Sequence, residues 1–210
     1  MSARCARLSG GAGILKGLDV PLCFATGNKG KYAEAARIAA RFGVRLTRVN
    51  RQKFEIQSDE LKEIACFAAK EASDAIHRAV VAEDSGFFVD ALGGFPGPYS
   101  SYIFRTIGNE GILRLMNSVR NRRAHFQAAV AFCNSRSPPV CFGGIVNGAV
   151  GRRVLGKRGF GFDPIFVPSE GDGRTFAQMS RNEKNVFSHR GRAFVEFFNW
   201  LTAGRESKLT

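Results

Sequence analysis

The stretch Pro21-Leu22-Cys23-Phe24-Ala25, followed by Thr26-Gly27-Asn28-Lys29-Gly30, decides the fold. The first five residues form a compact apolar run, which is typical of a buried strand. The polar loop breaks that run, and apolar residues then recur at helical spacing to about residue 42, where Gly43 ends the helix. Residues 44–49 alternate as a second strand. This strand-loop-helix-strand unit predicts an α/β protein.

The same periodicities predict the remaining elements. We expect helices at residues 59–77, 109–119 and 188–201, a short helical turn at 176–183, and strands at about 79–83, 86–90, 124–134 and 140–150. Ser58 is expected to cap the first of these helices. The last two strands are joined by residues 135–139, which predicts a long antiparallel hairpin.

Composition narrows the class of protein. The 210 residues favour one domain. The sequence contains no run of eighteen apolar residues, so we expect no segment that spans a membrane. A net charge of +13 favours anionic partners: nucleotides, nucleic acid or a membrane surface. The five cysteines are scattered without Cys-x-x-Cys spacing, which argues against a disulfide framework and favours a reducing compartment. The three histidines lie far apart in the sequence, so a structural zinc site is not expected.

The two ends of the chain differ from its middle. Residues 1–20 combine basic residues with a glycine-rich stretch, and we interpret them as a flexible extension, with an organelle transit peptide as the alternative. We expect one two-lobed domain over residues 21–204, a short tail at 205–210, and a cytoplasmic location.

Two groups of residues suit an anion and a metal ion. The loop from Thr26 to Lys31 can point backbone N–H groups at an anion, and Lys29 and Lys31 add positive charge. Glu83 and Asp84 follow the apolar run 79–82, at the predicted end of a strand. With Glu55 they give three carboxylates that could share one magnesium ion. Taken alone, each pattern also fits an ordinary polar turn.

Two further groups suit a base and its phosphates. The stretch Gly159-Phe160-Gly161-Phe162-Asp163-Pro164 places two aromatic rings and a carboxylate in a glycine-jointed loop, where they can stack on a base and bind its edge. Downstream, Lys184 can meet a phosphate, and His189 and Arg190 stand at the start of a helix. The alternative interpretation of each is a core phenylalanine or a capping residue.

Together these motifs resemble the inosine triphosphate pyrophosphatase family over about residues 21–201. The resemblance rests on five stretches in family order: Thr26-Gly27-Asn28-x-x-Lys31, Glu83-Asp84-Ser85-Gly86, Gly93-Gly94-x-Pro96-Gly97-x-Tyr99-Ser100, Phe160-Gly161-Phe162-Asp163-Pro164, and Glu183-Lys184-Asn185-x-x-Ser188-His189-Arg190. Residues 54–57 and 98–102 look most like the archaeal branch. Many members carry Tyr or Trp where this chain has Phe162.

The resemblance implies a two-lobed mixed α/β sheet with long curved strands, flanking helices and a central nucleotide cleft. It implies hydrolysis of nonstandard purine triphosphates (ITP, dITP, XTP) to the monophosphate and pyrophosphate, and a homodimer. Magnesium would be held by Glu55, Glu83 and Asp84, with Asp84 activating the attacking water. The implied substrate-binding residues are Thr26, Gly27, Asn28, Lys29, Gly30, Lys31, Ser85, Phe160, Gly161, Phe162, Asp163, Lys184, His189 and Arg190.

Two rival interpretations remain at this stage. A septum-inhibitor-like pyrophosphatase for modified pyrimidine nucleotides would share the architecture, but it expects a different basic motif after the first strand. A basic nucleic-acid-binding protein is suggested by the net charge of +13. No helix-turn-helix or basic helix supports it.

Overall fold

Strand β1 (Leu22–Ala25) pairs in parallel with β2 (Leu46–Val49) on one side and with β3 (Val80–Val89) on the other. The sheet continues antiparallel through β5 (Arg123–Cys133), β6 (Val140–Val150) and β7 (Phe166–Pro168), and the short β4 (Pro96–Gly97) pairs with β3. The computed structural model describes residues 21–50, 56–135 and 137–206. The mixed sheet confirms the predicted fold class.

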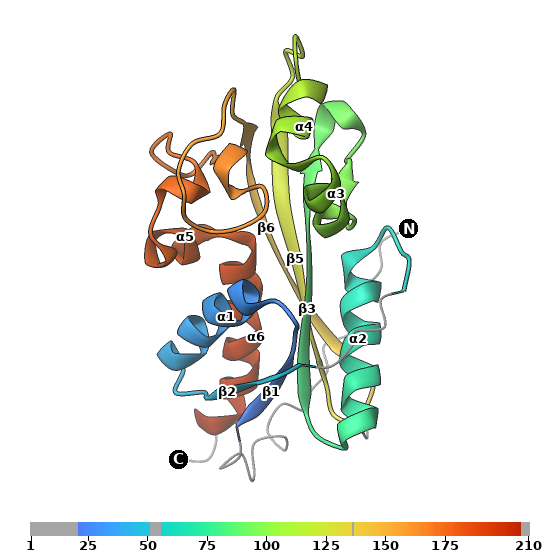
Figure 1. The fold of residues 1–210 in the computed structure, drawn as a ribbon. Coiled ribbons are helices and arrows are strands. Elements are labelled where there is room, and N and C mark those ends of the chain that lie inside the picture. The colour runs from blue at the N-terminus through green and yellow to red at the C-terminus, as the bar shows by residue number, and fades with distance from the viewer. Residues whose placement is uncertain (1–20, 51–55, 136, 207–210) are drawn as a thin grey trace, which may run out of the picture.

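Helices cover both faces of this sheet (Figure 1). The helices are α1 (Lys29–Arg41), α2 (Leu61–Ile76), α3 (Ser100–Thr106), α4 (Gly108–Leu115), α5 (Arg181–Phe187) and α6 (His189–Glu206), with short 3-10 turns at Asp90–Leu92, Asp163–Ile165 and Phe176–Gln178. Helices α1 and α6 lie on one face of the lower half and α2 lies on the other, while α3, α4 and α5 surround the upper half.

The predicted loop after β1 begins helix α1 by side-chain capping. The Asn28 side-chain oxygen accepts from the backbone N–H groups of Gly30 at 2.8 Å and Lys31 at 3.1 Å. The Thr26 hydroxyl accepts from the Asn28 N–H at 3.1 Å. Two of the donors that a helix start leaves unpaired are thereby satisfied. The helix ends at Arg41, with Phe42 as its C-cap, and the predicted terminator Gly43 follows with a positive φ of 64°.

The prediction of two strands at 79–83 and 86–90 was wrong, because β3 runs unbroken from Val80 to Val89. Glu83 pairs with Val130 and Asp84 pairs with Ala129 of β5, so the two carboxylates stand within a strand rather than at its end. Strand pairing supplies the backbone hydrogen bonds that a polar pair would otherwise find in a turn.

Three helix predictions also need correction. The predicted helix 109–119 is α4, preceded by α3, which the sequence pattern missed because seven residues are too few to show a period. The predicted turn 176–183 divides at Ser180, which caps α5 through a capping box with Glu183. Helix α2 begins at Leu61, because the Ser58 hydroxyl accepts the N–H of Glu60 in the turn before the helix.

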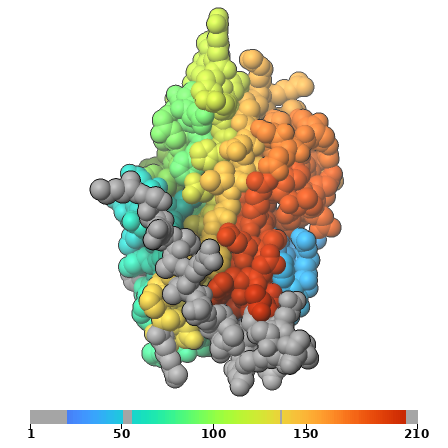
Figure 2. Space-filling view, turned by 180° about the vertical axis from the view of Figure 1, so that it is seen from behind, coloured from blue at the N-terminus to red at the C-terminus, as the bar shows by residue number. Residues whose placement is uncertain are grey.

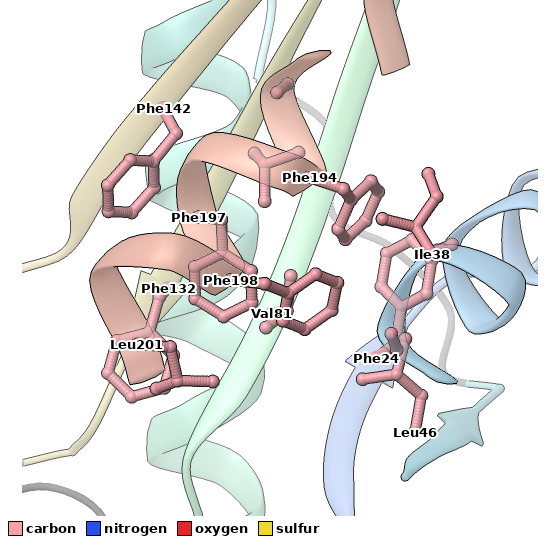
Figure 3. Packing of buried hydrophobic residues seen from close by; sticks show 14 of the residues in the cluster. Phe24, Ile38, Leu46, Val81, Phe132, Phe142, Phe194, Phe197, Phe198 and Leu201 are labelled. Carbon is pink, nitrogen blue, oxygen red and sulfur yellow. The ribbon is translucent and has the colours of Figure 1, made fainter. Parts of the chain in front are cut away.

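Phenylalanines fill the core between α6 and the sheet. Phe194, Phe197 and Phe198 of α6 pack with Phe24 of β1 and Phe132 of β5 (Figure 3). Seen from behind, α6 (red) lies at the surface against the yellow and orange strands of the hairpin (Figure 2). A second apolar cluster fills the upper half, and α2 covers a third on the opposite face of the sheet. Each of the long strands β3, β5 and β6 places side chains in or against all three clusters.

Candidate functional site

A cleft of about 910 Å³ lies where the lower and upper halves of the molecule meet. Its walls come from the loop before α1, the middle of β3, helix α3, the loop 160–163 and the start of α6. The predicted site residues that line it are Thr26, Gly27, Asn28, Lys31, Glu83, Asp84, Ser85, Phe160, Gly161, Phe162, Asp163, Lys184, His189 and Arg190. The structure therefore brings together residues that are distant in the sequence.

Two residues of the predicted phosphate loop do not line the cleft. Lys29 is exposed at the first turn of α1, and Gly30 lies behind the cleft wall. A Cβ atom added to Gly30 would lie 2.8 Å from the Phe160 ring, so this glycine permits close packing of the loop 160–163 against α1. The predicted direct contact of Lys29 and Gly30 with substrate is not supported by their position.

The acidic pair on β3 faces a lysine across the cleft floor. The Lys31 ammonium lies 2.9 Å from Glu83 and 3.8 Å from Asp84. A positive charge is thus already accommodated between the two carboxylates, and their oxygens are ligands that a hard cation prefers. Glu55, the third predicted ligand, lies outside the described residues. Within the described part of the chain, no three Asp, Glu, His or Cys side chains converge on one point.

Behind this pair lies a buried ionic network. Arg190 is 1% exposed, and its guanidinium donates to Glu83 at 3.1 Å, to Glu34 at 2.5 Å and to the Ser85 hydroxyl at 2.9 Å. Lys184 bridges Glu34 at 3.0 Å and Asp163 at 2.7 Å. Burial raises the cost of any unpaired charge, so each ion in this network depends on its partners.

Glu34 links the two cations, and sequence reasoning missed it. It stands on the inner side of α1 among apolar residues, where a carboxylate is rare unless it is paired. That position next to Ala35 and Ile38 was the available signal. Burial raises the pKa of Glu34, but the charges of Arg190 and Lys184 outweigh burial and hold that pKa below its ordinary value.

The pKa of Asp163 shifts in the opposite direction to that of Glu34. Burial raises its pKa above the ordinary value, Lys184 opposes this, and the nearby charge of Glu34 adds to it. The Asp163 carboxylate also accepts the backbone N–H of Phe160 at 2.9 Å. This carboxylate therefore closes the loop 160–163 and anchors it to Lys184.

His189 is a neutral, buried imidazole at the cleft. Burial lowers its pKa well below 6.5, and the positive charges of Arg190, Lys184 and Lys31 lower it further. Its ring stacks on Phe126, with centroids 4.8 Å apart. Its Nδ1 atom has no hydrogen-bond partner among the described residues, so a ligand or a water molecule is needed to satisfy it.

The two predicted aromatic rings differ in their surroundings. Phe162 is buried and stacks on Phe87 at 5.2 Å, so most of its surface belongs to the upper core. Phe160 is only partly buried and carries the Lys184 ammonium at 5.1 Å and the Arg190 guanidinium at 5.4 Å from its centroid. Phe160 is the better placed of the two to contact a base.

Comparison with known proteins identifies the family of this chain. The sequence profile of the Ham1 family matches residues 22–200. This chain belongs to the Ham1 family. It is 48% identical over 185 residues to a "dITP/XTP pyrophosphatase" of Methanopyrus kandleri, which covers 87% of this chain and 98% of that protein. It is 47% identical to a protein of the same description from Hyperthermus butylicus, over 86% of this chain and 94% of the relative.

Two solved structures share the fold of this chain. A HAM1 protein from Coxiella burnetii matches with a TM-score of 0.76 at 26% identity, covering 88% of this chain and 99% of that one. A structure from Mycobacterium abscessus, described as a nucleoside-triphosphatase or dITP/XTP pyrophosphatase, matches with a TM-score of 0.67 at 31% identity, covering 85% and 98% of the two chains. The predicted family and its archaeal branch are confirmed.

No helix in the described part of this Ham1-family chain is long and apolar enough to cross a membrane.

Proposed function

We propose that this protein is a dITP/XTP pyrophosphatase, which hydrolyses noncanonical purine nucleoside triphosphates to the monophosphate and pyrophosphate. The observation that carries the proposal is the cleft, in which cations that suit a triphosphate, an acidic pair and a partly exposed aromatic ring face one another. The relatives named above support the same activity.

Lys31 and the Asn28 loop hold the triphosphate. Lys31 lies in the first turn of α1, and its ammonium pairs with Glu83. When substrate binds, the ammonium can exchange Glu83 for a phosphate oxygen. The positive end of α1 points toward the same place. The Ser85 hydroxyl, which accepts a hydrogen bond from Arg190, is a further group that can bind the phosphates.

The acidic pair fits a magnesium ion. Magnesium is commonly bound in proteins by one or two carboxylates together with substrate phosphates and water, so Glu83 and Asp84 form a sufficient protein contribution. Glu55 is the third ligand that the sequence predicts. When bound, the ion supplies positive charge that offsets the charge developing on the phosphate oxygens.

Asp84 acts as the general base. Its carboxylate accepts a proton from a water molecule whose oxygen attacks the α-phosphorus. The bond between the α-phosphorus and the bridging oxygen breaks, and pyrophosphate leaves with the bonding electrons. Arg190 keeps Glu83 in place beside this carboxylate, because its guanidinium is also held by Glu34.

Base recognition falls to Phe160, Asp163 and His189, whereas the Arg190 guanidinium is occupied by Glu34, Glu83 and Ser85. Hypoxanthine and xanthine present a 6-oxo acceptor and an N1–H donor, whereas adenine presents the reverse polarity. A neutral His189 offers one N–H donor for the oxo group. Asp163 accepts from N1–H, and Lys184 keeps that carboxylate charged. A mismatched base leaves these buried groups unpaired, which gives strong discrimination. We further propose a homodimer and a cytoplasmic location.

The test is a pyrophosphate-release assay on dITP, XTP, ITP, dATP and dGTP, with and without magnesium. We expect turnover of dITP and XTP that requires the metal, and little turnover of dATP. Asp84→Asn should lower kcat by roughly 10³-fold or more, while Asp172→Asn, which changes an exposed carboxylate paired with Arg174, should not. Equal turnover of dITP and dATP, or an active Asp84→Asn variant, would overturn the proposal.

A further inference from the structure

Three cysteines gather on the sheet face that α2 covers, away from the groups assigned to catalysis. Cys66 of α2, Cys133 of β5 and Cys141 of β6 pack in the same apolar cluster. Cys133 is buried, and its thiol donates to the backbone oxygens of Asn134 and Ser137. Cys66 and Cys141 are only partly buried, so a small reagent can reach them.

The Cys66 and Cys141 side chains contact each other across the boundary between α2 and β6. The Cys66 and Cys141 thiols lie within hydrogen-bonding distance of each other, and the Cys141 thiol also faces the backbone oxygen of Phe142 at 4.0 Å. Cys141 is fixed by strand pairing opposite Ala131, and Cys66 is fixed by α2, whose neighbouring Ala65 and Ala68 are buried against the sheet. Because each sulfur comes from a rigid element, the contact does not require a loop to move.

The two thiols differ in acidity in a way that suits sequential reaction. The hydrogen bond from Cys141 lowers the pKa of Cys66 to about 7; burial opposes the shift, and Lys62, one turn earlier on α2, assists it. The same hydrogen bond raises the pKa of Cys141, and burial adds to that rise. A thiolate with a pKa near neutrality is an effective nucleophile, and a neighbouring thiol can then resolve the product.

We propose that Cys66 and Cys141 form a redox-active dithiol, which closes to a disulfide between α2 and β6 when it meets a small-molecule disulfide. The Cys66 thiolate attacks one sulfur of the oxidant, forms a mixed disulfide and expels one thiolate. Cys141 loses its proton and attacks the Cys66 sulfur, which expels the second. The protein thus loses two protons and two electrons, and the small disulfide is reduced to two thiols.

The cross-link would join two parts of the cleft scaffold. Helix α2 carries Ile64, which lines the cleft, and β6 supports the start of α6 through the close contact at Gly144. A disulfide between residues this far apart in sequence restricts the unfolded chain and raises the melting temperature. The expected increase in Tm is on the order of 5–10 °C for a chain of this length.

The experiment treats the reduced full-length protein with oxidised glutathione and maps the products without reduction. Trypsin cleaves at Lys62, Lys70, Arg136 and Arg152, so Cys66, Cys133 and Cys141 fall on separate peptides. We expect one cross-linked species joining peptides 63–70 and 137–152, an intact mass that is lower by two hydrogens, and the rise in Tm. Dithiothreitol should reverse all three changes.

Matched variants separate this pair from its neighbour. Cys133→Ala should still form the cross-link, whereas Cys66→Ala and Cys141→Ala should each lose it. With oxidised glutathione, Cys141→Ala should stop at a stable glutathione adduct on Cys66, because the resolving thiol is missing. A wild-type protein that yields only glutathione adducts, or a cross-link that includes Cys133, would overturn the proposal.

Discussion

Lys184 stands between two buried carboxylates, with its Nζ 3.0 Å from Glu34 and 2.7 Å from Asp163. It also lies over the rings of Phe160 and Phe176, which keep water away from it. Removing one member of a buried ion pair costs more than the pair itself contributes, because the remaining charge loses its compensation. Lys184 therefore supports the fold as well as the cleft.

We expect Lys184→Met to lower the free energy of unfolding by about 3–5 kcal/mol, since two buried carboxylates lose their shared cation. Urea denaturation at neutral pH measures the change. The control is Lys70→Met, which removes an exposed lysine paired with Asp74 and should leave the midpoint nearly unchanged. A Lys184→Met midpoint close to that of wild type would contradict the assignment of a charged buried network.

His189 makes stability depend on pH. Its folded-state pKa lies well below 6.5, because burial and three nearby cations disfavour the charged form. Between the folded and unfolded pKa values the unfolded chain binds more protons, so the free energy of unfolding falls as the pH drops through this window. The slope from this residue is at most about 1.4 kcal/mol per pH unit.

We therefore expect wild type to lose more stability than His189→Gln between about pH 7 and about pH 5. Urea midpoints measured across this range give the difference. The pKa of His125 is also lowered by burial, but its contribution is present in both proteins and cancels in the comparison. Glu34 loses its stabilising effect only at lower pH, since its pKa lies below the ordinary value. Parallel curves would show that His189 is not held neutral.

At the scale of elements, the site depends on how closely α6 approaches β6. A Cβ atom added to Gly144 of β6 would lie 2.1 Å from the backbone oxygen of His189 and 2.7 Å from the nitrogen of Ala193. Backbone atoms cannot move aside as a flexible side chain can. The glycine therefore sets the position at which α6 begins, and with it the positions of His189 and Arg190.

Gly144→Ala should push the first turn of α6 away from the sheet. We expect a loss of about 1–3 kcal/mol in the free energy of unfolding and a higher KM for dITP. The adjacent Gly143→Ala is a close control, because its added Cβ would have nothing within 4 Å. Equal effects of the two substitutions would indicate a general loss of strand flexibility instead.

Elements with a clear period could be predicted from the sequence, and contacts between elements could not. The hairpin of β5 and β6 and the helices α1 and α6 follow from alternation and helical spacing. The unbroken course of β3 through Glu83 and Asp84 could not be predicted in this way. A buried acidic pair is tolerated there because β3 pairs with β5 and because α1 and α6 supply cations. Glu34 was missed for the same reason: its partners lie about 150 residues away.

At the scale of the molecule, the charges of the cleft largely balance. Lys31, Lys184 and Arg190 face Glu34, Glu83 and Asp163, with Asp84 beside them. The net charge of +13 therefore arises elsewhere on the chain. A basic exterior around a balanced cleft attracts polyanions over a distance without holding them by unpaired buried cations.

A highly charged triphosphate should be steered by this exterior field. We expect kcat/KM for dITP to fall by roughly 3–10-fold as NaCl rises from about 0.01 M to about 1 M, because the Debye length shrinks from about 30 Å to about 3 Å. Magnesium is kept saturating throughout, and kcat should change little, since groups inside the cleft are shielded from salt. Sucrose of matched viscosity controls for slower diffusion. A kcat/KM that is independent of salt would mean that the excess positive charge does not act on the substrate, and that binding depends on contacts within the cleft alone.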